Sequence, residues 1–228
     1  MSTNPDSAAP VTGLPVGLTI GLLGGTGDQG RGLARRLALA GYSVILGSRD
    51  AGRATAQAEL LGLGITGTDN SSCASDADIV IVAVPYNGHA ELLGGLGQEL
   101  AGKIVVDCVN PLGFDKQGAY VLAVPDGSAA EEAARVLPGS RVVGAFHNVS
   151  AVQLLDPDLE SVECDVLVLG DDREATDAVE ALVESIPGMR GVFAGRLRNS
   201  AQVEGLTANL IAINRRCRAH ASLRITGI

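Results

Sequence analysis

Residues 18–30 read LTIGLLGGTGDQG, and this stretch decides the fold. An apolar run typical of a buried strand comes first, glycines follow at positions 25, 27 and 30, and a helical pattern begins directly after them. The first glycine permits a tight turn, the second lets a pyrophosphate approach backbone N–H groups, and the third lets helix and strand pack closely. The helix N-terminus adds a partial positive charge. We therefore expect this loop to bind a dinucleotide through Gly25, Thr26, Gly27, Asp28, Gln29 and Gly30.

The end of the next apolar run indicates which dinucleotide is bound. NAD-specific sites usually place a carboxylate here to hold the ribose hydroxyls, and that charge would repel a 2′-phosphate. This chain has Ser48 and Arg49 instead, with Arg53 about one helical turn further on. Charge-assisted hydrogen bonds from such groups favour NADP. The competing acidic residue is Asp50, which we expect to cap the following helix.

Short apolar, β-branched runs alternate with Ala- and Leu-rich stretches along the first two thirds of the chain. This rhythm is typical of right-handed crossovers between parallel strands. It predicts an α/β fold of Rossmann type, a doubly wound and mainly parallel sheet with a smaller C-terminal α/β lobe. Strands are expected at 18–23, 43–46, 79–84, 103–107 and 141–146, and helices after the glycine loop and at 53–61 and 90–100.

The pattern changes after Phe146, where we place a loose boundary near residue 150. Residues 1–16, rich in Ser, Pro and Ala, are expected to be a disordered leader, 17–150 the NADP-binding domain, and 151–228 the smaller lobe. The lobe should contain strands at 165–169 and near Val192, with helices over about 171–185 and 199–216.

Composition excludes several classes of function. The 228-residue chain carries a formal net charge of −9, so a nucleic-acid backbone would repel it. Its longest apolar run, residues 79–85, is too short to cross a bilayer, and the N-terminus lacks the pattern of a signal peptide. The four cysteines are scattered without a Cys-x-x-Cys pair, which indicates neither a zinc site nor a disulfide framework. We expect a cytoplasmic protein with reduced thiols and no bound metal.

Few side chains in the sequence suit acid–base catalysis. His89 and His147 follow predicted strands, at the edge where open α/β sheets bind ligands, although His89 could equally be satisfied by its surroundings. Asp107 could touch a ligand or orient the turn that follows it. Asp171 and Asp172 stand where a helix begins, and capping explains them without a metal.

The last 33 residues carry an unusual charge. From residue 196 onward there are six arginines (196, 198, 215, 216, 218 and 224) and one acidic residue, Glu204. Two readings stay open. In the first, some of these arginines complement the negative end of a helix dipole at its C-terminus. In the second, some of them bind an anionic part of a ligand.

Several segments together resemble the F420-dependent NADP oxidoreductases, from about residue 16 to the end. The glycine loop alone would fit many families, whereas the later segments are specific. Departures from the family pattern are Tyr86, one residue inserted before His89, and Val149-Ser150 in place of an Ile-Pro step. The segments that carry the resemblance are Leu22–Gly27, Gly47–Arg49, Val84–Tyr86, Ala145–His147, Asn199–Ser200 and Val203–Glu204.

This resemblance implies reversible hydride transfer between NADP(H) and coenzyme F420, a deazaflavin, by a homodimer. Carried over by position, Ser48, Arg49 and Arg53 would hold the 2′-phosphate. The nicotinamide would be flanked by Val84, Pro85, Asn110 and Ala151. The deazaflavin would be lined by His89, His147, Asn148, Val149, Ser150, Ala151 and Leu223.

Hydride transfer between two planar cofactors depends mainly on orientation and exclusion of water, so no essential general acid or base is expected, with His147 as a candidate. Two alternatives stay open. The first is an NADP-dependent reductase of a small imine or keto acid, which would need a proton donor, and Lys occurs here only at positions 103 and 116. The second is a non-catalytic NADP(H)-sensing module.

Overall fold

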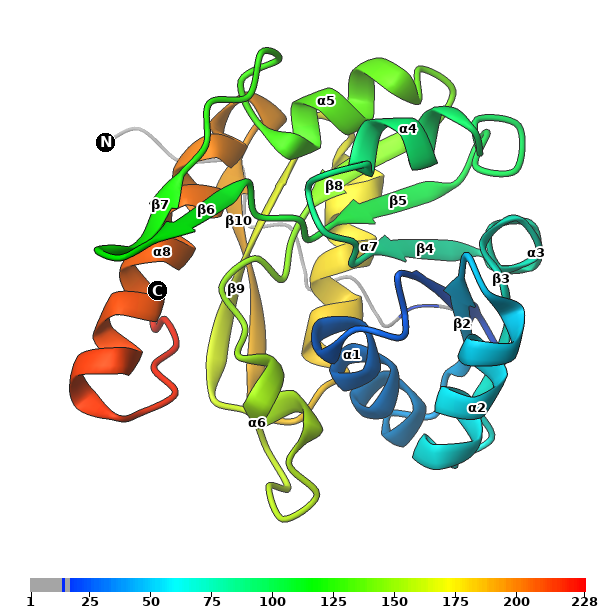
Figure 1. Cartoon of the computed structure of the whole chain (residues 1–228), viewed down its shortest axis with the longest axis horizontal. Coiled ribbons are helices and arrows are strands. Elements are labelled where there is room, and N and C mark those ends of the chain that lie inside the picture. Colours follow the sequence, from blue (N-terminus) through cyan, green and yellow to red (C-terminus); the bar gives the residue numbers. More distant parts are fainter. Residues whose placement is uncertain (1–13, 15–16) are drawn as a thin grey trace, which may run out of the picture.

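The seven predicted strands and one further strand, β3, form one sheet in the order β10-β9-β8-β5-β4-β1-β2-β3 (Figure 1). The computed structural model describes residue 14 and residues 17–228. The parallel strands are β1 (Thr19–Leu23), β2 (Ser43–Ser48), β3 (Thr66–Asp69), β4 (Ile79–Val82), β5 (Ile104–Asp107) and β8 (Arg141–Gly144). β9 (Cys164–Gly170) joins β8 antiparallel, and β10 (Met189–Gly195) pairs with β9 in parallel. The mainly parallel, Rossmann-type sheet is thus confirmed.

Helices cover both faces of the sheet, each over its own apolar core. One face carries α1 (Asp28–Leu39), α2 (Ala51–Leu61), α6 (Ala151–Leu155) and α7 (Arg173–Glu184). The other carries α3 (Asn70–Asp76), α4 (His89–Gly94) and α5 (Ala129–Val136). Completely buried side chains such as Leu33 and Leu37 of α1 and Leu93 of α4 fill the two cores. These layers hold the carboxyl ends of the central strands at one edge, where the chain order reverses between β1 and β4.

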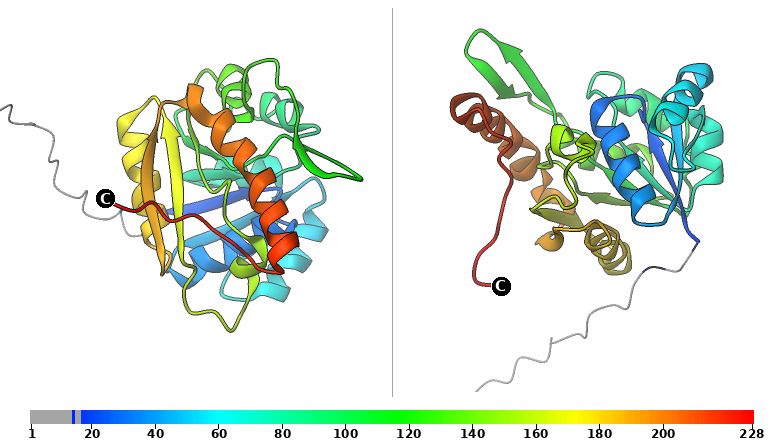
Figure 2. Two further views of the ribbon diagram at one scale, coloured as in Figure 1. Left: turned by 90° about the vertical axis from the view of Figure 1, so that its left-hand side faces the viewer. Right: turned by 90° about the horizontal axis from the view of Figure 1, so that it is seen from below.

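The C-terminal segment extends the same sheet through β9 and β10. After the 3-10 turn η1 (Leu197–Asn199), α8 (Ser200–Cys217) crosses the end of the sheet. The last residues then turn back along β9, where Asp165 N donates to Leu223 O (2.9 Å). Figure 2 shows α8 beside a hairpin that projects from the body, formed by β6 (Leu112–Asp115) and β7 (Gly118–Val121).

Some expected elements differ in extent. The helix expected at 90–100 is regular only as α4, because Gly94, Gly95 and Gly97 interrupt it. The strand expected to reach residue 84 ends at Val82, just before the Val84-Pro85 step. The expected leader, 1–16, falls outside the described residues except for Leu14, which packs against the core.

Candidate functional site

The loop between β1 and α1 requires glycine at several positions for packing. Gly24 has φ +74°, and a Cβ on it would lie 2.7 Å from Ala83 O. A Cβ on Gly30 would lie 2.7 Å from the Cα of Gly25, so helix and strand approach closely only because both residues are glycine. Gly27 is different, because the nearest atom to a Cβ there would be 3.6 Å away. A side chain there would make only an ordinary contact with Gly24 O, so packing does not require this glycine, and the approach of a pyrophosphate explains it.

The N-terminus of α1 is left free for such a group. Side-chain oxygens of Asp50, Asp69, Ser128 and Asp172 cap α2, α3, α5 and α7. The residue that precedes α1 is Gly27, and within the described residues no side chain caps this helix, as is also true of α4, α6 and α8. Its first N–H groups and the positive end of its dipole therefore suit an anion.

The end of β2 carries the residues expected at a 2′-phosphate. Ser48 is buried and accepts from Asp50 N (3.2 Å), while Arg49 and Arg53 are exposed. Within the described chain neither guanidinium pairs with a carboxylate. Asp50 caps α2 by accepting from Arg53 N (3.1 Å), which confirms its predicted role. The two cations are therefore free to bind a phosphate.

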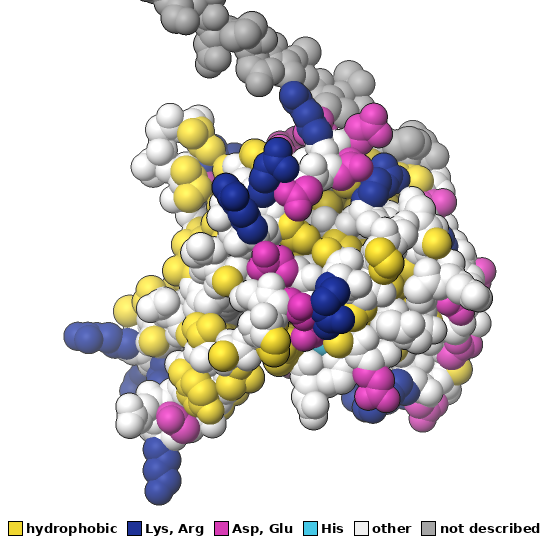
Figure 3. Space-filling model, turned by 90° about the horizontal axis from the view of Figure 1, so that it is seen from above, with side chains coloured by type: hydrophobic (Ala, Val, Ile, Leu, Met, Phe, Trp, Pro, Cys, Tyr) yellow, Lys and Arg dark blue, Asp and Glu magenta, His cyan; other side chains and the backbone are white. Residues whose placement is uncertain are grey.

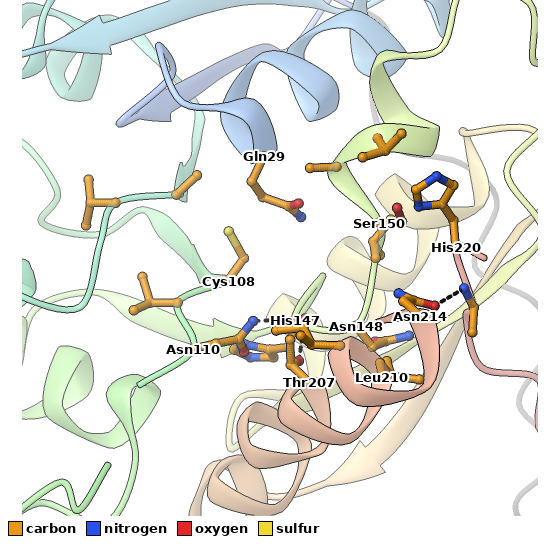
Figure 4. Close-up of a pocket in the computed structure, with 18 residues that line it drawn as sticks. Gln29, Cys108, Asn110, His147, Asn148, Ser150, Thr207, Leu210, Asn214 and His220 are labelled. Atoms are coloured by element: carbon orange, nitrogen blue, oxygen red, sulfur yellow. Dashed lines mark hydrogen bonds between the residues drawn. The ribbon is translucent and has the colours of Figure 1, made fainter. Parts of the chain in front are cut away.

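A cavity of about 400 Å³ begins at the glycine loop and extends to α8 (Figure 4). Its walls come from segments far apart in the sequence, and they contain no Lys, Arg, Asp, Glu or Tyr. They are Gln29 of α1, Ala83 and Val84 after β4, Cys108 to Asn110 after β5, His147 to Val152, four residues of α8 (Thr207, Leu210, Ile211 and Asn214), and His220 and Ala221.

This cavity brings together much of the predicted site. Gln29, Val84, Asn110 and residues 147–151 share its wall, and Pro85 is not among the lining residues. Sequence reasoning missed Cys108 and the α8 residues. The apolar pattern of α8 could mark it as a helix, but could not say that the face bearing Asn214 meets a cavity.

His147 stands at the cavity floor with its ring turned into the protein. Asn110 Nδ2 and Thr207 Oγ1 both donate to His147 O (3.0 and 2.8 Å), which leaves Asn110 Oδ1 to accept from His147 Nδ1 (3.2 Å). The ring is 2% exposed, and burial lowers its pKa to about 4. His147 is therefore neutral at physiological pH and fixes the floor through its backbone oxygen.

The structure does not bring His89 into the cavity. Its fully buried ring lies between Asp107 (Nε2 to Oδ2, 2.6 Å) and Glu132 (Nδ1 to Oε1, 3.0 Å). Burial opposes a charge on the ring, but the two carboxylates outweigh it and raise the pKa of His89 to about 9. Asp107 also accepts from Val109 N (3.0 Å), so it orients the turn that carries Asn110. The position of His89 near a strand end did not show whether its ring binds buried carboxylates or contacts a ligand.

Leu223 also lies outside the cavity wall, because its segment runs along β9. His220 and Ala221, slightly earlier in the same segment, line the cavity instead. Asp172 caps α7 by accepting from Ala175 N (2.9 Å), the role expected of the Asp171-Asp172 pair. No cluster of three metal-binding side chains occurs in the part of the chain that the structure describes.

The uncapped glycine turn at the switch point of the sheet, with a cavity that begins at the same turn, defines a Rossmann-type dinucleotide-binding protein with space for a second ligand. Residues 19–111 match the family model described as NADP oxidoreductase, coenzyme F420-dependent. The F420-dependent NADP reductase of Methanothermobacter marburgensis is 40% identical over 223 residues, which cover 92% of this chain and 99% of that protein. The chain belongs to the F420-dependent NADP oxidoreductase family.

Solved structures agree with this assignment. A crystal structure from Arthrobacter sp. FB24, provisionally named an F420-dependent NADP reductase, has a TM-score of 0.81 and 26% identity, covering 92% of this chain and all of that one. An imine reductase from Streptomyces aurantiacus has a TM-score of 0.56 at 22% identity and is covered over 61% of its length. The similarity to the imine reductase shows only that the two proteins share a fold.

Proposed function

We propose that this enzyme transfers a hydride reversibly between NADP(H) and coenzyme F420. The observation that carries the proposal is the cavity beside the glycine loop, whose walls include no carboxylate, amine or phenol. Its buried groups are held neutral: His147 has a lowered pKa, and burial raises that of the Cys108 thiol. Such a site suits a reaction in which the two cofactors carry the chemistry and the protein aligns them.

Each part of the site has a role in this alignment. The loop from Gly25 to Gly30 holds the pyrophosphate, and Ser48, Arg49 and Arg53 hold the 2′-phosphate. Val84 and Asn110 flank the nicotinamide, and residues 147–151 face the deazaflavin. The hydride passes directly from the dihydronicotinamide carbon to the ring carbon of the deazaflavin, and the proton that completes F420 reduction comes from water. Because both rings must meet within about 3–3.5 Å, the walls need to be rigid.

The decisive experiment mixes purified enzyme, NADPH and oxidised F420 and follows the loss of the visible absorbance of F420. We expect bleaching with NADPH, and much slower bleaching with NADH. A small imine or keto acid replaces F420 in the control. NADPH oxidation by the imine or keto acid alone would support the reductase alternative, and nucleotide binding without any turnover would support the sensor.

We also propose that the enzyme is a homodimer. The hairpin exposes Phe114 (68%) and Val121 (55%), and the outer face of α8 exposes Ile213 (45%). Figure 3 shows a group of hydrophobic side chains at the lower left of the molecule, with Lys and Arg side chains projecting beside it. Exposed apolar residues on one projecting hairpin and its neighbouring helix favour contact with a second copy. We expect Phe114→Asp to shift the sedimentation coefficient from dimer to monomer, and a wild-type monomer would contradict the proposal.

We also propose that the enzyme works in the cytoplasm. Cys73, Cys108 and Cys164 are buried free thiols, and Cys217 is an exposed one. Free thiols are typical of a reducing compartment. Among the described helices, none has both the length and the apolarity that spanning a bilayer requires.

A further inference from the structure

The arginines near the C-terminus divide into two groups in the structure. Arg196 lies 3.6 Å from Asp171, and Arg224 pairs with Asp165 and Glu163. Arg198, Arg215, Arg216 and Arg218 are exposed, and within residues 17–228 none of them lies within 4 Å of a carboxylate; the last three stand together at the end of α8. In a chain of net charge −9, three adjacent uncompensated cations are available for an anion from outside.

Two of these arginines lie near the part of α8 that lines the cavity. Thr207, Leu210, Ile211 and Asn214 line the cavity at steps of three and four residues. Arg215 lies four residues beyond Ile211, at one edge of this stripe. Arg218 follows the last residue of α8 in a left-handed conformation (φ 52°), and its N–H donates to Asn214 O. Arg216 lies two residues beyond Asn214, about 200° round the helix, on the opposite face.

The helix end that carries them is well ordered. Asn214 O accepts from the N–H of Arg218 and of Ala219, and its side-chain oxygen accepts from Ala221 N (2.6 Å). These bonds satisfy the backbone carbonyl of Asn214 and fix the turn that follows the helix. They also turn the chain so that exposed His220 joins the cavity wall, as Figure 4 shows beside Asn214.

We infer that Arg215 and Arg218, beside the cavity-lining His220, form a cationic rim that binds the anionic tail of the deazaflavin, its phosphodiester and glutamate carboxylates. This inference rests on the proposed function and adds the site for the part of the ligand that does not react. The ring enters the cavity between residues 147–151 and α8, and the tail leaves along the stripe on α8. Because the rim is exposed, its attraction for the tail weakens as ionic strength rises.

The test combines removal of the ligand's anionic tail with removal of the positive charges of the rim. The double variant Arg215→Gln/Arg218→Gln is compared with Arg216→Gln, using complete F420 and the ribityl deazaflavin that lacks phosphate and glutamates. We expect the double variant to raise the KM for F420 roughly 5- to 30-fold and to reduce its salt dependence. The KM for the shortened acceptor, the KM for NADPH and kcat should stay unchanged, and Arg216→Gln should behave as the wild type.

Several outcomes would overturn the rim. An equal rise in KM for both acceptors would mean that the arginines act on the ring pocket or on folding. An equal effect of Arg216→Gln would mean that only overall charge matters, and an unchanged KM for F420 would remove the site altogether. If the wild type reduces neither acceptor, the proposed function fails first, and the rim fails with it.

Discussion

Replacement of Arg36 by methionine should loosen the wall that faces the deazaflavin. Arg36 lies on α1 and is 3% exposed. Its guanidinium donates to four carbonyl oxygens at the end of α6 and in the turn beyond, at distances of 2.7 to 3.0 Å: those of Gln153, Leu154, Asp156 and Leu159. At the other end of α1, Gln29 Nε2 donates to Phe146 O (3.3 Å). Hydrogen bonds from α1 thus fix both ends of the segment 146–159.

The expected loss of stability follows from these bonds. A hydrogen bond to a charged group contributes about 1.5–3 kcal/mol, so four such bonds represent roughly 6–12 kcal/mol before offsets. Burial of the guanidinium opposes this by several kcal/mol, and desolvation accordingly lowers the pKa of Arg36. Methionine keeps the apolar stem, and some freed carbonyls can bind water. We therefore expect Arg36→Met to lower the free energy of unfolding by roughly 2–4 kcal/mol, which corresponds to a fall in Tm of about 5–15 °C.

Calorimetry measures the stability, and steady-state kinetics measures what the wall does. Arg36→Met should raise the KM for F420 and lower kcat, and it should alter the KM for NADPH less, because the glycine loop does not depend on Arg36. Arg35→Met is the matched control, since Arg35 is the neighbouring arginine and the structure gives it no hydrogen bond. Equal loss of stability in both variants, or an equal rise in the KM of both substrates, would refute the reasoning.

Three further predictions concern single residues. Arg49→Ala should raise the KM for NADPH about 10- to 100-fold and leave any activity with NADH nearly unchanged, and an equal loss with both nucleotides would contradict the assignment of the 2′-phosphate. Gly32→Ala should lower the free energy of unfolding by about 1–3 kcal/mol, because the new Cβ would lie 2.6 Å from the Leu154 Cβ. In the control Gly94→Ala the new Cβ meets no atom within 4 Å, so the same thermal melts should show no loss of stability. The pKa of His89 is about 9 in the folded chain and 6.5 in the unfolded one. The protonated ring therefore stabilises the fold fully below pH 6.5, and this contribution is lost as the pH rises through 9. Urea unfolding of His89→Gln should show a smaller decrease over that interval than the wild type, and an unchanged decrease would show that another group causes it.

The sequence predicts elements that form from their own residues. β1, α1 and β2 combine apolar patterns of the right period with glycine at the turn. The two strands end within two residues of the predicted ends, and α1 begins at Asp28, inside the glycine loop expected to precede it. α6 escaped prediction because five residues cannot hold a helix by themselves, and contacts with Arg36 on α1 support it. β3 escaped for a related reason: the short polar stretch Thr66–Asp69 becomes a strand only by pairing with β2.

In the candidate site, too, some features follow from the local sequence and others depend on contacts between distant segments. The glycine loop and the arginines after β2 depend on local spacing, so sequence alone indicates them. The faces of α8 and the place of His89 depend on packing between distant segments. His89 begins α4, which turns the ring under the sheet edge toward Asp107 and Glu132, and nothing in its neighbouring residues indicates that direction.

Charge is abundant beside the cavity, whereas the described residues of its walls include no Lys, Arg, Asp or Glu, and burial favours the neutral forms of His147 and Cys108. Arg36 fixes the turn after α6, His89 and Asp107 fix the turn that carries Asn110, and Asp165 accepts from Arg190, Arg224 and Ile225 N to hold the C-terminal segment. Buried charges stabilise a protein little unless they are fully paired, but paired ones restrict the conformations that a chain can adopt. A hydride transfer that tolerates little error in the separation of two rings needs such restriction. Charged groups behind each wall supply it without placing an acid, a base or ordered water between the reacting carbons.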